Sequence, residues 1–274
     1  MNFLDQLPLA VVLLGAILAQ VILIEAGFRY GSGKQRKPNK AQMAQVRAIM
    51  GASLGLLAFM LAFSFSMAQQ HFEERTRAYM LEISAIGSSY RGAELIGKEA
   101  GDDAKALLRY FTKLRLDISQ AARQSDRQAL VRMIRESERI HDLLWSIAET
   151  SMEGSGENMS SGLFAQSVLA MINAHDARLQ AAIFNRISPV IWLTLFAMSL
   201  LSMGVMGYQA GLTGTRSSLA TWTLAITFSA VMTLITDLDR PNMTLFQMNQ
   251  DLMVELQNRI SGGEIWDPAT HEDP

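Results

Sequence analysis

Long stretches without a charged side chain recur along this chain and alternate with strongly polar ones. Four of them cover residues 8–24, 48–68, 187–215 and 217–236. A helix rises about 1.5 Å per residue, so about 20 apolar residues cross the hydrocarbon core of a bilayer. The pattern predicts an all-α integral membrane protein with four transmembrane helices. We expect the first helix to be retained, because residues 1–8 carry only Asp5 and lack the positive charge that begins a signal peptide.

The region between the second and third apolar stretches is polar and reads as helix throughout. No proline occurs between Lys40 and Pro189, so nothing forces a helix to end there. Apolar residues recur at helical spacing in two runs, at 107, 108, 111, 114, 116 and 118 and at 130, 134, 140, 143, 144 and 147. We expect a helical bundle inserted between spans 2 and 3, with a break at Gly101, an N-cap at Ser125 and an exposed loop over 152–162.

The apolar and polar segments divide the chain into four parts. Residues 1–68 hold spans 1 and 2 with a basic loop at 29–47, and residues 69–186 form the helical bundle. Residues 187–240 hold spans 3 and 4, and residues 241–274 form a short amphipathic helix and a disordered acidic tail. The apolar face of that helix is expected to carry Leu245, Met248, Leu252 and Leu256.

The loop at 29–47 sets the expected orientation in the membrane. It carries six basic residues and no acidic one, whereas the middle region is balanced, with 15 basic and 16 acidic residues. Short basic loops stay on the cytoplasmic side. We therefore expect a cytoplasmic basic loop and a non-cytoplasmic N-terminus and middle domain, in a bacterial inner (plasma) membrane.

Composition removes several classes of function. The net charge is −2, so there is no basic field for nucleic acid, and no cysteine is present for disulfides, thiolate catalysis or thiolate metal sites. The four histidines are scattered, and no phosphate-binding loop, dinucleotide loop or nucleophile elbow occurs. We expect no enzyme activity, no cofactor and no nucleic-acid partner; the expected partners are the lipid bilayer, inorganic ions and further copies of the chain.

The second span is the most patterned of the four. Gly51, Gly55 and Ala62 share one helix face, and small residues let helices approach closely in lipid. Phe59 and Phe63 are spaced by four, and such a pair repeated around an axis would form a hydrophobic constriction. The predicted pore-lining set is Gly51, Gly55, Phe59, Ala62, Phe63 and Ser66. The same residues could instead pack a helix bundle and face lipid, and both interpretations stay open.

Charged residues at the span ends are candidates for structural ion pairs. Glu25 and Arg29 are spaced by four at the inner end of the first span, as an ion pair or a proton relay would require. Asp237 and Asp239 end the fourth span beside Arg240. The three could form an internal clasp, or the two carboxylates could bind a divalent cation through oxygen ligands.

A second charged group precedes the third span. His175, Asp176 and Arg178 lie in the predicted helix there and could pair across the bundle with Glu73, Glu74 or Glu82. A histidine next to an aspartate, with no nucleophile in view, more often has a structural role than a catalytic one.

Several of these segments together resemble one family. Residues 51–68, 72–75, 82–91, 171–178, 189–192 and 237–241 are similar to the bestrophin-like domain family, also called the DUF4239 family, and the resemblance covers about residues 5–255. It implies a relation to bestrophins, pentameric anion channels with four spans per subunit and a neck of bulky apolar residues on the second span. Phe59 and Phe63 resemble that neck in spacing and place.

Two departures from bestrophins accompany the resemblance. Bestrophins keep both termini and the long middle region in the cytoplasm, whereas the basic loop here predicts the opposite. The long acidic calcium-binding run of animal bestrophins is absent, and only Asp237 and Asp239 stand near that place.

Three functions follow as hypotheses. The first is an oligomeric ion channel that conducts anions, with span 2 lining the pore and an aromatic constriction. The alternative is a non-conducting membrane sensor or scaffold with an external helical bundle. An intramembrane enzyme that uses Asp237 and Asp239 is a third.

Overall fold

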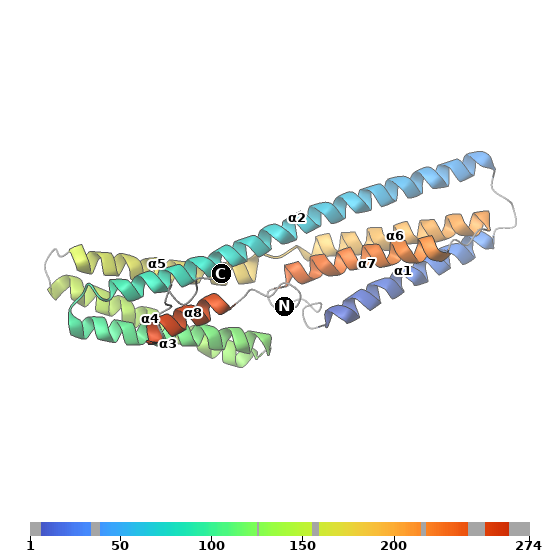
Figure 1. Cartoon of the computed structure of the whole chain (residues 1–274). Coiled ribbons are helices and arrows are strands. Elements are labelled where there is room, and N and C mark those ends of the chain that lie inside the picture. The colour runs from blue at the N-terminus through green and yellow to red at the C-terminus, as the bar shows by residue number, and fades with distance from the viewer. Residues whose placement is uncertain are drawn as a thin grey trace, which may run out of the picture. The chain divides into compact units, whose positions relative to one another are not determined.

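The computed structural model describes residues 7–33, 39–124, 126–154, 159–214, 218–240 and 250–262. Every regular element in these ranges is a helix, as the sequence predicts (Figure 1). In chain order the helices are α1 (Leu9–Ser32), α2 (Lys40–Gly92), α3 (Lys98–Arg123), α4 (Arg127–Gly154), α5 (Met159–Phe184), α6 (Pro189–Thr213), α7 (Ser218–Asp239) and α8 (Asp251–Ser261).

The chain divides into two compact units. The first unit contains residues 1–73 and 186–246, and the second contains residues 74–185 and 247–274. The boundary falls inside α2, so the two parts of this one helix belong to different units.

Helices long and apolar enough to cross a membrane supply most of the first unit. They are α1, α2, α6 and the 221–239 part of α7. The prediction of four apolar spans is confirmed, and the chain is an integral membrane protein. α6 begins where Pro189 follows the N-cap residue Ser188, because proline suits the first helical turn.

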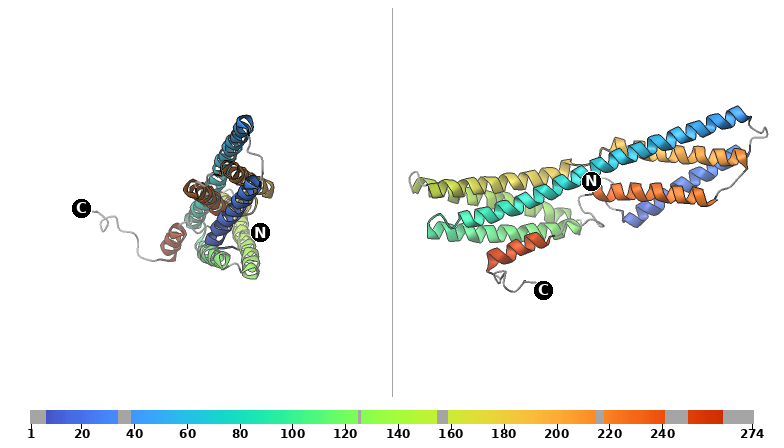
Figure 2. Two further views of the ribbon diagram at one scale, coloured as in Figure 1. Left: turned by 90° about the vertical axis from the view of Figure 1, so that its right-hand side faces the viewer. Right: turned by 45° about the horizontal axis from the view of Figure 1, so that its top comes forward.

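Glycines bring α1 and α6 into close contact (Figure 2). A Cβ atom on Gly27 would collide with the backbone carbonyl oxygen of Gly204. A Cβ on Gly207 would collide with that of Ile24. Helices in lipid gain no hydrophobic driving force from each other, so close backbone packing of this kind holds them together.

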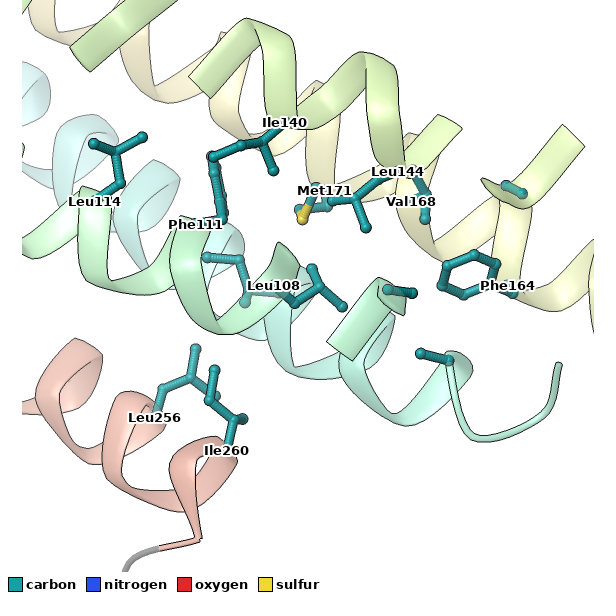
Figure 3. Packing of buried hydrophobic residues seen from close by; sticks show 14 of the residues in the cluster. Leu108, Phe111, Leu114, Ile140, Leu144, Phe164, Val168, Met171, Leu256 and Ile260 are labelled. Atoms are coloured by element: carbon teal, nitrogen blue, oxygen red, sulfur yellow. The ribbon is translucent and has the colours of Figure 1, made fainter. Parts of the chain in front are cut away.

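The second unit is built around one apolar core. The end of α2 together with α3, α4, α5 and α8 supplies its side chains (Figure 3), which include Leu108, Phe111, Ile140, Leu144, Phe164, Val168 and Met171. Burial of this apolar surface drives the unit together.

The short helix α8 packs against α3 in this core. Its buried face consists of Met253, Leu256 and Ile260, whereas Leu252 is exposed. The predicted apolar face was therefore wrong at Leu252, and its members Leu245 and Met248 lie outside the described residues. The carbonyl oxygen of Ile260 accepts hydrogen bonds from Arg109 Nε at 2.7 Å and Tyr90 Oη at 3.1 Å. These bonds supply donors to a carbonyl group in the last turn of α8, where the helix itself offers none.

The predicted break at Gly101 was also wrong. α2 continues to Gly92, α3 begins at Lys98, and Gly101 is buried inside α3. A Cβ there would collide with the carbonyl oxygen of Ala93. This glycine therefore permits a close backbone approach and does not end a helix.

Two predicted loops are shorter in the structure. α4 runs to Gly154 and α5 begins at Met159, so only part of the expected loop 152–162 is non-helical. α1 runs to Ser32 and α2 begins at Lys40, so both ends of the basic segment 29–47 are helical. Ser125, the expected N-cap, and residues 263–274 of the expected disordered tail lie outside the described residues.

Candidate functional site

The α2 helix presents two different faces within the first unit. Leu57, Leu61 and Ser64 are buried, with Ala68 one turn further on. The six residues predicted to line a pore fall on the opposite side and are all exposed in the single chain: Gly51, Gly55, Phe59, Ala62, Phe63 and Ser66. Phe59 is 65% exposed and Phe63 is 52% exposed, so these rings contribute little to the packing of their own chain.

The exposed face of α2 differs in composition from the exposed face of α1. The exposed face of α1 carries large aliphatic side chains, namely Val11, Leu14, Leu18 and Ile22. The face of α2 instead mixes Gly, Ala and Ser with two Phe rings. A Cβ on Gly51 or Gly55 would meet no atom within 4 Å, so packing inside the chain does not require these glycines.

Asp239, near the end of α7, holds the segment that leads into α6. Its Oδ1 accepts the backbone N–H of Ile187 at 2.7 Å, and its Oδ2 lies 3.7 Å from Arg186 Nη2. Asp237 is fully buried, and its backbone carbonyl oxygen accepts the N–H of Arg240 at 3.2 Å. Both oxygens of Asp239 thus face donors of the protein.

Among the described residues no group of three or more His, Cys, Asp or Glu side chains could hold a metal ion. Near the C-terminal end of α1, Arg29 Nε lies 2.9 Å from Glu25 Oε1, within one helix and partly exposed to solvent. An exposed pair of this kind contributes little to stability, about 0.3–0.5 kcal/mol.

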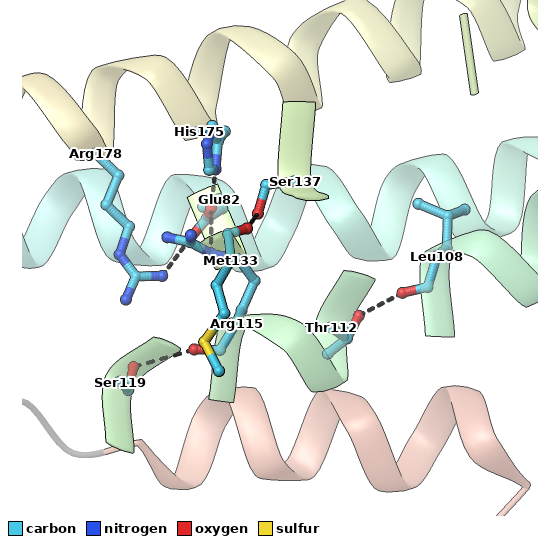
Figure 4. Close-up of polar contacts among 9 residues, drawn as sticks. All are labelled: Glu82, Leu108, Thr112, Arg115, Ser119, Met133, Ser137, His175 and Arg178. Atoms are coloured by element: carbon cyan, nitrogen blue, oxygen red, sulfur yellow. Dashed lines mark hydrogen bonds and ion pairs between the residues drawn. The ribbon is translucent and has the colours of Figure 1, made fainter. Parts of the chain in front are cut away.

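The second unit contains a buried ionic cluster centred on Glu82 of α2 (Figure 4). Arg115 Nε of α3 and His175 Nδ1 of α5 lie 3.0 and 3.1 Å from Glu82 Oε1. Arg178 Nη1, also of α5, donates to Glu82 Oε2. We call Glu82, Arg115, His175, Arg178 and the adjacent His141 the Glu82 cluster.

Three acids were candidates to pair with His175 and Arg178, and the structure places both side chains on Glu82. Glu73 and Glu74 are exposed, and Glu74 Oε2 accepts a hydrogen bond from Asn185 Nδ2 at 2.5 Å. Asp176 is exposed as well.

His175, which contacts the carboxylate, packs edge to face against a second imidazole. The ring of His141 on α4 lies 4.7 Å from that of His175, at an interplanar angle of 80°, and 5.1 Å from that of Phe111. Within the described part of the chain, Nε2 of both histidines is buried without a hydrogen-bond partner.

The cluster lies beyond the charge-free stretch 48–68, and burial and neighbouring charges shift the pKa values of three of its members. Burial raises the pKa of Glu82, but the hydrogen bond from His175 and the charges of Arg178 and Arg115 outweigh it and lower the pKa to about 2. Burial lowers the pKa of Arg115 to about 10, against the attraction of Glu82. Burial and the charge of His175 lower the pKa of His141 to about 4.

Arg115 and His141 did not stand out in the sequence, although a signal for each was there. Arg115 follows Leu108 by seven and Phe111 by four, so it lies on the apolar face of α3. His141 precedes Leu144 by three, so it likewise lies on the apolar face of α4. A charged or titratable residue on an apolar stripe indicates a buried partner.

A family model decides the relationship of this chain to known proteins. The model of the bestrophin-like domain matches residues 14–243. The chain belongs to the bestrophin-like family. No curated protein matches it.

Solved structures show the same bestrophin-like fold at low sequence identity. A membrane protein carrying a glycine-to-alanine substitution is 14% identical with a TM-score of 0.62, and the match covers 94% of this chain and 100% of that one. A bacterial bestrophin homologue from Klebsiella pneumoniae with an aspartate-to-alanine substitution is 14% identical with a TM-score of 0.60, over 92% and 97%. A bacterial bestrophin homologue from the same organism with an isoleucine-to-threonine substitution is 14% identical with a TM-score of 0.55, over 97% and 100%.

Proposed function

We propose that this protein is an oligomeric ion channel that conducts anions, with α2 lining the pore. The observation that carries the proposal is the exposed face of α2. It bears no charge from residue 48 to residue 68, and it combines small residues with Phe59 and Phe63. Several copies arranged around an axis would bring these faces together.

The exposed aromatic pair supports a hydrophobic constriction in this pore. Phe59 and Phe63 are one helical turn apart, so two adjacent rings of phenylalanine would narrow the lumen. Constrictions of this kind stop ions by excluding water from the pore. Gly51, Gly55 and Ser66 would leave backbone groups and a hydroxyl open to a partly dehydrated ion. The family resemblance supports the same arrangement, since bestrophins carry an apolar neck on the second span.

The second unit fits a helical bundle outside the membrane, inserted between the spans of α2 and α6. Its helices α3 and α4 are amphipathic and carry charged residues along their exposed sides. We place this bundle and the N-terminus on the non-cytoplasmic side because of the basic segment 29–47. The chain contains no cysteine, so single cysteines at Gly97 and Asn39 can be labelled in cells without background. Labelling by an impermeant reagent at Gly97 and not at Asn39 is expected; the reverse pattern would give the bestrophin orientation.

Ion flux from liposomes that contain the purified full-length protein tests the channel. Chloride and potassium gradients are imposed separately, so that flux reports both conduction and the sign of the ion. Phe59→Ala and Phe63→Ala are expected to raise basal flux, because each widens the constriction. Leu18→Ala is the matched control, since Leu18 is an equally exposed apolar residue, 62% exposed, on α1. No flux from folded, oligomeric protein would overturn the channel, and flux equal to that of the wild type in both Phe variants would overturn the constriction.

The alternative is a non-conducting membrane sensor or scaffold. The Glu82 cluster favours it, because a buried polar centre in the second unit serves no purpose in conduction by α2 alone. A sensor would need a separate signalling partner, since the segments between α1 and α2 and between α6 and α7 are short. Absence of flux together with a stable co-purifying protein would support this function.

A further inference from the structure

The Glu82 cluster joins four helices of the second unit, and conduction by α2 makes no use of it. Glu82 of α2, Arg115 of α3 and Arg178 of α5 supply one negative and two positive charges. His175 shares the carboxylate of Glu82, and His141 of α4 meets His175 edge to face. All four helices therefore depend on one polar centre for part of their packing.

Within the cluster, His141 is the member that no carboxylate contacts. The residue is 6% exposed, and its ring packs against those of His175 and Phe111. Nε2 of His141 and Nε2 of His175 are both buried, and within the described ranges neither has a hydrogen-bond partner. A proton added to Nε2 of His141 would find no acceptor there, so the added charge would be both desolvated and unpaired.

The charged groups around His141 add repulsion to this cost. The groups that act on it from the packed helices are His175 of α5, Glu82 of α2 and Arg115 of α3, and Arg178 of α5 binds the same carboxylate of Glu82. The charged residues next to it on its own helix, Glu138, Arg139 and Asp142, are exposed. The cluster already contains two guanidinium groups and only one carboxylate. A protonated His141 would add to this excess of positive charge in a low-dielectric site.

We propose that the Glu82 cluster is an acid-sensitive lock, in which protonation of His141 releases α4 from the helices packed around Glu82. The second unit is closed at neutral pH and loosens as the pH falls toward about 5, in the range where histidine titrates. Release begins at α4 because its only member of the Glu82 cluster is His141, which forms no ion pair with Glu82. In contrast, α3 and α5 are bound to Glu82 through Arg115 and Arg178.

The direction follows from proton linkage. A histidine in an opened state has a pKa near 6.5, and the buried His141 has a pKa of about 4. Between these values the opened state binds more protons than the closed one, so the closed state loses stability as the pH falls. From neutral pH to about 5 the population of the opened state is expected to rise by on the order of tenfold or more.

Hydrogen–deuterium exchange of the full-length protein in micelles, followed by mass spectrometry, tests the lock. Exchange is compared at about pH 7.5 and about pH 5, with labelling times scaled for the intrinsic pH dependence of amide exchange. Peptides from α4 around His141 are expected to lose protection at the lower pH by on the order of tenfold, while peptides from α1 and α6 do not change. Unchanged protection of α4 in the wild-type protein would overturn the proposal by itself.

Two variants assign the effect to His141. His141→Phe keeps an aromatic ring against Phe111 and removes the titration, and His141→Gln removes the titration with a smaller side chain. Both are expected to keep α4 protected at the lower pH. His71→Phe is the matched control, because His71 is a half-buried histidine of α2 in the first unit, and it should respond like the wild type. A response of wild-type size in either His141 variant would overturn the assignment.

Discussion

Arg115 Nε lies 3.0 Å from Glu82 Oε1, and the two side chains are 2% and 0% exposed. A carboxylate buried this deeply is tolerated only because cations and hydrogen-bond donors surround it. The pair joins α2 to α3 across the core of the second unit, and Arg178 and His175 join α5 to the same carboxylate.

Removing the carboxylate from this pair is expected to destabilise the second unit strongly. Glu82→Ala leaves Arg115 buried without its counterion, and the loss of one partner of a buried pair costs about 3–5 kcal/mol. Chemical denaturation followed by tryptophan fluorescence measures the change, with Trp145 as a probe within the second unit. Glu73→Gln, at an exposed carboxylate of the same helix, should change the free energy of unfolding little. Equal effects of the two substitutions would contradict the buried role of Glu82.

Arg178 is expected to set the acid resistance of Glu82. The folded pKa of Glu82, about 2, lies below its ordinary value of 4.5, so its contribution to stability is present above 4.5 and is lost as the pH falls toward 2. Arg178→Gln removes one charge that lowers this pKa, so Glu82 should contribute less stability above 4.5, and the protein should unfold at a higher pH. Acid unfolding followed by circular dichroism measures the shift. Arg77→Gln, at an exposed arginine, serves as control and should leave the acid midpoint in place.

Gly207→Ala is expected to disrupt the contact of α1 with α6. The added Cβ would collide with the backbone carbonyl oxygen of Ile24, and backbone cannot move aside as a flexible side chain can. Overpacking of this kind costs about 1–3 kcal/mol, which a lower thermal midpoint in micelles would report. Gly15→Ala is the matched control, because its Cβ would meet no atom within 4 Å. A thermal midpoint as low in Gly15→Ala would mean that the α1–α6 contact is not responsible, because alanine favours a helix more than glycine does.

Substitutions of Asp239 distinguish a structural clasp from a cation site. Asp239→Ala removes the acceptor for the N–H of Ile187 and the partner of Arg186, so the thermal midpoint should fall. Asp239→Asn keeps an acceptor oxygen and should retain part of that stability. A divalent chelator should leave the wild-type midpoint unchanged if the clasp is the role of this residue. A chelator effect that disappears in Asp239→Asn would instead establish cation binding.

The sequence could predict part of the candidate site. The exposed set from Gly51 to Ser66 followed from helical spacing, because residues on one face of a continuous helix stay together whatever surrounds them. The sequence could predict that His175 and Arg178 pair with an acidic side chain, but spacing along the chain did not distinguish Glu73, Glu74 and Glu82 as the partner. Only packing distinguished them, since Glu82 turns toward α3 and α5 while the other two face solvent.

By itself the sequence determined that the chain is helical and carries four membrane spans, because the length of an uncharged run and the period of an apolar stripe are local properties. The tertiary structure alone decided that Arg115 and His141, from two further helices, complete the Glu82 cluster. It also decided that Gly101 permits a close approach to Ala93 and ends no helix. These features depend on which helices touch, and contact between distant segments is a matter of three-dimensional packing.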